Sequence, residues 1–218
     1  MLWKWFMQQR LRYTPSKTVA NLVRYNARVN MIRVTDTKVF VNISGDARTV
    51  EADFCVSTIP MPIFAKLTTN LDPAVIQAAT AIPGIPAGKV GWQAERFWEK
   101  ETDIVGGISW VEGLADQVWY PSNGFLSKRG VLTGAYMFGP KAVTFNAKSI
   151  EERMAISRAA IDALHPGRGK LLKHGVAIAW ERMEHLQMGF VDEESDGFKK
   201  FAPVVAAPQH NRLFQAGD

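Results

Sequence analysis

Three closely spaced runs of apolar residues between residues 29 and 58 constrain the fold most strongly. Residues 29–34 and 38–43 alternate apolar and polar side chains, and residues 50–58 form a more continuous apolar run. Alternation of this kind is typical of half-buried strands, and short runs of turn residues separate the three segments. The pattern predicts an antiparallel meander, which Pro60 and Pro62 end because proline donates no hydrogen bond to a sheet.

Two later segments are predicted to be helices. Residues 71–79 have Pro73 in the first turn, a position that proline favours. Ser149 and Glu152 form a capping-box pattern, in which each side chain bonds the backbone amide of the other. The apolar face of this second helix continues to residue 164 and comprises Ile150, Met154, Ile161 and Leu164.

Further strands are predicted in the second half of the chain. Residues 117–120 and 131–136 flank the turn signal Asn123-Gly124 and predict a hairpin with a long loop. Strands also resume at Lys89, and residues 175–180 form a last candidate. Strands and helices together predict a mixed α/β (α+β) fold.

Composition limits the class of protein. At 218 residues and 47% hydrophobic, the chain can bury a core as one large domain or two small ones. No apolar run approaches the roughly 18 residues that span a bilayer, so no membrane segment is expected. Cys55 is the single cysteine and cannot form an intrachain disulfide, which favours a reducing compartment and a cytoplasmic location.

Several kinds of site are excluded by the pattern. The net charge is +5, but basic residues are interleaved with acidic ones, so no nucleic-acid partner is expected. The four histidines are 9, 11 and 25 positions apart and predict no metal site. Residues 84–90 have one residue too few for a phosphate-binding loop, and residues 107–111 lack the second glycine of a nucleophile elbow.

An ordered set of motifs resembles the flavin-containing amine oxidases, of the monoamine oxidase and L-amino-acid oxidase type. Each motif is weak alone, and their order along the chain carries the resemblance. They are ADFCVSTIP at 52–60, GKVGWQAERFWE at 88–99, GGISW at 106–110, WYPS at 119–122 and FQAGD at 214–218.

The resemblance implies two domains and FAD as the cofactor. Residues 1–62 would belong to the FAD-binding domain as its meander, residues 63–200 to the substrate-binding domain, and residues 201–218 to the FAD-binding domain again. No Gly-x-Gly-x-x-Gly occurs in the sequence, so the turn that receives the cofactor's pyrophosphate is expected elsewhere. The chain is therefore expected to be the C-terminal part of such an enzyme, and a partner chain could carry the missing segment.

Lys89 resembles the family's lysine that holds a water against the reactive nitrogen of the flavin. The alternative is a surface lysine on a strand edge. Trp98 follows nine positions later, one fewer than is usual in the family, which leaves the register of Lys89 open because a one-residue slip reverses the faces of a strand.

Tyr120 resembles the tyrosine that binds substrate, carboxylate included, in L-amino-acid oxidases, and Trp180 resembles an aromatic residue lining the flavin side of the pocket. For each, the alternative is an aromatic side chain buried in the core. Gly217 and Asp218 resemble the contact to the ribityl and phosphate part of FAD, and Val29 resembles the residue near the adenine.

The reaction implied is oxidation of a primary amine or L-amino acid to the imine, with oxygen reduced to hydrogen peroxide. A monooxygenase outcome is also possible within the family. The alternative from another class is a non-catalytic remnant or interaction module, which would bind another chain through its bare apolar surfaces and sheet edge.

Overall fold

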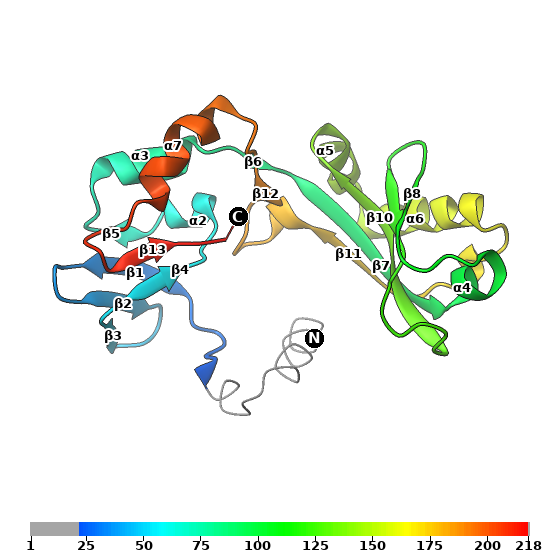
Figure 1. The fold of residues 1–218 in the computed structure, drawn as a ribbon, viewed down its shortest axis with the longest axis horizontal. Helices are drawn as coiled ribbons and strands as arrows, with labels where there is room; N and C mark the ends of the chain where they lie inside the picture. Colours follow the sequence, from blue (N-terminus) through cyan, green and yellow to red (C-terminus); the bar gives the residue numbers. More distant parts are fainter. Residues whose placement is uncertain (1–21, 218) are drawn as a thin grey trace.

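The predicted meander is confirmed at the start of the first of two lobes (Figure 1). The computed structural model describes residues 22–217. Strands β1 (Val29–Val34), β2 (Val39–Ile43) and β3 (Thr49–Ala52) pair antiparallel in sequence order. Strand β5 (Thr68–Thr69) adds to β1 in parallel.

The third predicted strand, residues 50–58, is divided, and its prediction as one continuous strand is wrong. After β3, the chain leaves the meander and forms β4 (Cys55–Ser57), which pairs in parallel with β13 (Leu213–Gln215). The Cys55 amide donates to the Arg212 carbonyl at 2.8 Å. Apolar character predicted an extended segment here, but it carries no information about a partner strand 158 residues away along the chain.

Three helices pack with the meander to form the first core. They are α2 (Met61–Phe64), α3 (Pro73–Ala81) and α7 (Asp196–Ala206). The predicted helix at 71–79 is confirmed as α3, and the Asp72 side chain caps it by accepting from the Ala74 amide at 2.8 Å. Phe64, Val75 and Leu213 are buried together, so the core unites distant parts of the sequence.

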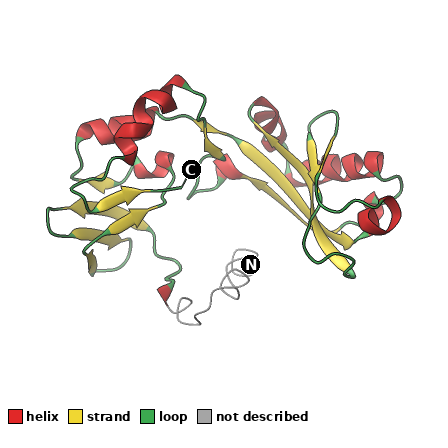
Figure 2. Cartoon of the chain, in the orientation of Figure 1, coloured by secondary structure: helices red, strands yellow, loops and turns green. Residues whose placement is uncertain are grey.

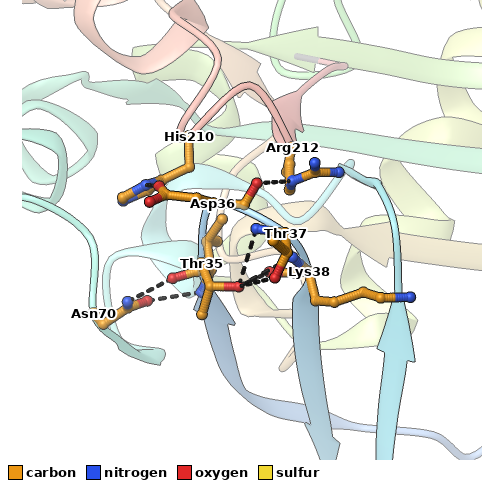
Figure 3. A network of polar contacts seen from close by, with 8 residues as sticks. Thr35, Asp36, Thr37, Lys38, Asn70, His210 and Arg212 are labelled. Atoms are coloured by element: carbon orange, nitrogen blue, oxygen red, sulfur yellow. Dashed lines mark hydrogen bonds and ion pairs between the residues drawn. The ribbon is translucent and has the colours of Figure 1, made fainter.

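A polar network ties β13 to the first turn of the meander (Figure 3). Arg212 Nε donates to the Asp36 carbonyl at 2.6 Å, and His210 Nδ1 lies 2.9 Å from Asp36 Oδ1. Asn70 pairs with the amide and carbonyl of Val34 at 2.8 and 2.7 Å. The contacts of His210 and Arg212 with Asp36 hold the segment that leads into β13 against this turn.

The second lobe contains a five-stranded sheet in the order β11-β7-β10-β9-β8. The predicted hairpin is confirmed, since β9 pairs antiparallel with β10. The strands are β7 (Ala87–Glu95), β8 (Ile108–Trp110), β9 (Gln117–Trp119), β10 (Arg129–Phe138) and β11 (Lys173–Ala179).

Helices cover one face of this sheet (Figure 2). They are α4 (Phe97–Thr102), α5 (Pro140–Asn146) and α6 (Ile150–Leu164), with a short 3-10 turn η2 (Gly169–Leu171) after α6. The capping box is confirmed: the Ser149 hydroxyl accepts from the Glu152 amide at 3.1 Å, and Glu152 accepts from the Ser149 amide at 2.8 Å. Among the described helices α6 is the longest, at 15 residues, and none has the length and apolarity to cross a membrane.

The two faces of β7 differ in what they contact. Val90, Trp92 and Ala94 are buried in the second core, whereas Lys89 and Gln93 are half-buried on the opposite face. We call this opposite face the open face. A β-bulge between Thr133 and Ala135 shifts the alternation of β10.

The two cores separate near residues 84 and 188. Residues 61–82 and 188–205 contribute to the first core, together with the meander and β13. The lobes are joined through β6 (Gly84–Ile85), β12 (Phe190–Val191) and the turn η3 (Trp180–Arg182) that follows β11. The predicted domain boundaries after residues 62 and 200 remain predictions.

Candidate functional site

A hollow of about 770 Å³ opens in the first lobe at the start of β1. Three segments line it, residues 26–30, residues 58–67 and the connection at 184–187. Its rim is polar: Arg28 pairs with Glu184 at 2.8 Å, and Lys66 Nζ donates to Gln187 Oε1 at 2.5 Å. The hollow is large enough for a nucleotide-sized ligand.

The carboxyl ends of β4 and β13 meet beside this hollow. Thr58 follows β4 and lines the hollow, and the Ala216 amide donates to the Ser57 carbonyl at 2.9 Å. Gly217 has φ +90°, and a Cβ at Gly217 would lie 3.9 Å from Thr58 Cβ. The carboxyl ends of parallel strands are the usual place for a nucleotide, and glycine there lets a ligand approach the backbone. The structure thus brings Val29 and Gly217 to one region, whereas Asp218 lies outside the described residues.

Lys89 lies on the open face of the second sheet. Strand β7 lies between β10 and β11, so Lys89 is not on an edge strand. It pairs with Tyr136 and Ile178, and its Nζ lies 4.4 Å from the centre of the Tyr136 ring. Burial lowers the pKa of Lys89 below the usual 10.5, which increases the fraction of neutral amine.

Four aromatic side chains, none of which the sequence pattern marked as a site residue, extend from Lys89 along the open face. We call them the aromatic wall, and they are Trp119, Tyr136, Phe138 and Phe190. Successive ring centres lie 5.7, 6.0 and 5.9 Å apart. Tyr136 and Phe138 are two positions apart, a spacing that predicts a shared face in a strand. Only the pairing of β10 with β7 places them beside Lys89.

Tyr120 points to the opposite side of the sheet. It is 6% exposed, and its hydroxyl lies 2.7 Å from His165 Nε2 and 3.2 Å from Ser109 Oγ. Burial raises the pKa of Tyr120. Its environment is that of a buried hydrogen-bonded core residue, and its neighbour Trp119 lies on the face that carries Lys89.

Trp180 lies at the end of β11 close to the start of β7. It directly follows Ala179, which pairs with Gly88, and it is half-buried. The structure therefore brings Trp180 near Lys89 at the end of the sheet that joins the first lobe. Across residues 22–217, no group of three His, Cys, Asp or Glu side chains could hold a metal ion.

Acid is expected to destabilise the second lobe through His165. Burial lowers the pKa of His165 below 6.5; Glu101 opposes this and Arg168 adds to it. The folded state therefore favours neutral imidazole, and its contribution is fully present above pH 6.5 and is lost as pH falls through the lower folded value. Urea unfolding followed from about pH 8 to about pH 5 should show this loss, and His165→Gln should remove it. An unchanged pH dependence in His165→Gln would contradict this origin.

Comparison with known proteins gives a family match and a common fold. A family model described as flavin containing amine oxidoreductase matches residues 9–218. Putrescine oxidase bound to putrescine is 18% identical, with 88% of this chain and 42% of that chain aligned and a TM-score of 0.68. Cyclohexylamine oxidase from Brevibacterium oxydans IH-35A is 14% identical, with 87% and 42% aligned and a TM-score of 0.70. The chain thus spans about two-fifths of the length of these structures.

Proposed function

Because the chain belongs to the family of flavin-containing amine oxidoreductases, we propose that it forms part of an oxidase that converts a primary amine to its imine. The observation that carries the proposal is a half-buried Lys89 beside the aromatic wall. An amine substrate needs a site that excludes bulk water and orients the carbon bearing the nitrogen. Within such a site, a lysine with a lowered pKa can hold a single bound water.

The hollow in the first lobe fits the adenosine end of FAD. Its volume suits a nucleotide, and Val29 and Thr58 line it where the carboxyl ends of β4 and β13 meet. Gly217 would let the cofactor approach the backbone, and Asp218 would continue this contact. When bound, FAD would supply the acceptor for the hydride of the amine carbon and the route by which its electrons reach oxygen to give hydrogen peroxide.

The residues of this chain would bind and orient the reactants. The aromatic wall offers flat apolar surfaces to the carbon skeleton of the substrate, and Lys89 would hold a water against the reactive nitrogen of the flavin. Trp180 would close the side of the pocket nearest the first lobe. The substrate class includes L-amino acids, but Tyr120 could bind a substrate carboxylate only after its hydroxyl left Ser109 and His165 and the side chain turned to the face that carries Lys89.

The proposal includes a further segment packed on β4, from the same polypeptide or from a partner chain. Phe54 and Val56 are 62% and 65% exposed, and among the described residues β4 pairs only with β13. A second parallel strand on the free edge of β4 would pair its backbone groups and bury Val56. Such a segment would also supply the glycine-rich turn for the pyrophosphate.

Replacing Lys89 in the complete flavoprotein tests the proposed function. Lys89→Met keeps an unbranched apolar side chain in place of the lysine stem but removes the amine, and we expect flavin reduction or reoxidation to slow by about tenfold, equivalent to about 1.4 kcal/mol. Stopped-flow absorbance of each half-reaction measures the effect. Lys173→Met is the matched control, because Lys173 is an exposed lysine on β11. Rates unchanged in both half-reactions of Lys89→Met would refute this role.

A further inference from the structure

Asn146 forms a buried junction between three elements of the second lobe. It is the last residue of α5 and is 1% exposed. Its Nδ2 donates to the Ala87 carbonyl on β7 at 3.2 Å and to the two carboxylate oxygens of Glu181 at 2.8 and 3.0 Å. Both neighbours are acceptors, so the amide nitrogen must face them and the orientation of the side chain is determined.

The junction is closely packed against the backbone of β7. A Cβ at Gly88 would lie 2.4 Å from Asn146 Oδ1 and 2.9 Å from Met137 Sδ, so this approach requires glycine. Asn146 Oδ1 itself is buried without a hydrogen-bond partner. An unsatisfied buried acceptor is unfavourable, so the bonds of Nδ2 and the surrounding packing must hold the side chain in place.

Two candidate site residues of this lobe, Lys89 and Trp180, lie next to this junction along the chain. Lys89 follows Gly88 in sequence, and Trp180 precedes Glu181. Gly88 also pairs with Ala179 across the two strands. The contacts of Asn146 therefore join the start of β7 to the turn that follows β11. Lys89 and Trp180 lie beside these two points.

We propose that Asn146 and Glu181 are positioning residues that hold Lys89 and Trp180 in register for the amine oxidation, a role that rests on the proposed function. The charged acceptor makes the bond to Glu181 stronger than a bond between neutral groups. Removing the hydrogen bond between Asn146 and Glu181 frees the turn that carries Trp180 and lets water reach the start of β7. Lys89 and Trp180 then lose their fixed separation although neither is changed.

The test uses the chain itself and needs no flavin. Lysines are methylated with ¹³C-formaldehyde, and NMR follows the titration of the Lys89 methyl signal and the indole N–H signal of Trp180. In Asn146→Ala we expect the Trp180 signal to move and the titration of Lys89 to shift towards 10.5 by at least about 0.3 pH units, a twofold change in the ratio of neutral to charged amine. The indole signal of buried Trp98, which lies on the core side, serves as the internal reference.

Two variants of Glu181 keep the test decisive if Asn146→Ala does not fold. Glu181→Ala removes the acceptor from a half-buried position and should reproduce both changes. Glu181→Gln keeps an oxygen that can accept from Asn146 and should retain the wild-type signals. The inference is overturned if Glu181→Ala leaves both signals unchanged, or if Glu181→Gln alters them as much as Glu181→Ala does.

Failure of the proposed function would be seen in a different measurement. Amine-dependent bleaching of the flavin in the complete flavoprotein reports the oxidation and is independent of the NMR titration of this chain. If the signals change in Glu181→Ala but the wild-type flavoprotein shows no amine-dependent bleaching, the junction does hold Lys89 and Trp180 but the proposed oxidation is rejected. Amine-dependent bleaching in the wild-type flavoprotein together with unchanged signals in Glu181→Ala would support the oxidation and reject the positioning role of the junction.

Discussion

Phe64→Ala is expected to destabilise the first lobe by about 3–5 kcal/mol, because it removes a fully buried aromatic side chain and leaves a cavity. Phe64 is 0% exposed and packs in the core formed by the meander, α3, α7 and β13. Since this core joins segments from both halves of the chain, residues 29–43 and 196–213 should lose protection together.

Hydrogen exchange read by peptide distinguishes the two lobes in this variant. Strands β7 and β10 belong to the second core and should keep the protection that they have in the wild type. Phe54→Ala is the matched control: Phe54 is exposed, and its loss should change the free energy of unfolding by less than about 1 kcal/mol. If β7 lost protection in Phe64→Ala while the meander kept it, residues 63–82 would belong with the second lobe, as the predicted boundary at residue 62 implies.

Local sequence signals predicted the elements that depend on neighbouring residues. The meander, the proline-led helix α3 and the capping box of α6 each follow from spacings of a few positions, and all three are present. The hairpin of β9 and β10 also follows from its turn signal. These features need no information about distant parts of the chain.

Pairing between distant segments could not be predicted in the same way. Residues 55–57 have an apolar pattern that suits several strand partners, and only the folded chain selects β13. The aromatic wall depends on the register of β9 and β10 and on the bulge at Gly134. A glycine within a strand indicates a bulge but does not fix which residues of the two strands pair. The junction of Asn146 with Glu181 joins a helix end to a turn 35 residues later, and neither residue belongs to a recognisable motif.

The faces of β7 decide whether Lys89 can belong to a site at all. Trp92 is 3% exposed, its Nε1 donates to the Ser157 hydroxyl on α6 at 2.9 Å, and the Arg158 guanidinium lies 4.5 Å from its ring centre. Gln93 points to the open face, as Lys89 does, because residues separated by an even number share a face. A slip of one residue in β7 would exchange these environments and bury Lys89 in the second core.

Trp92→Ala should therefore destabilise the second lobe by about 3–5 kcal/mol, through the lost packing and the unpaired Ser157 hydroxyl. Gln93→Ala, its neighbour on the same strand, should change the free energy of unfolding by less than about 1 kcal/mol. Urea unfolding followed by circular dichroism measures both variants under one set of conditions. A large loss in Gln93→Ala with a small one in Trp92→Ala would mean that β7 is shifted by one residue. Lys89 would then face the core, and its proposed role beside the amine would have to be abandoned.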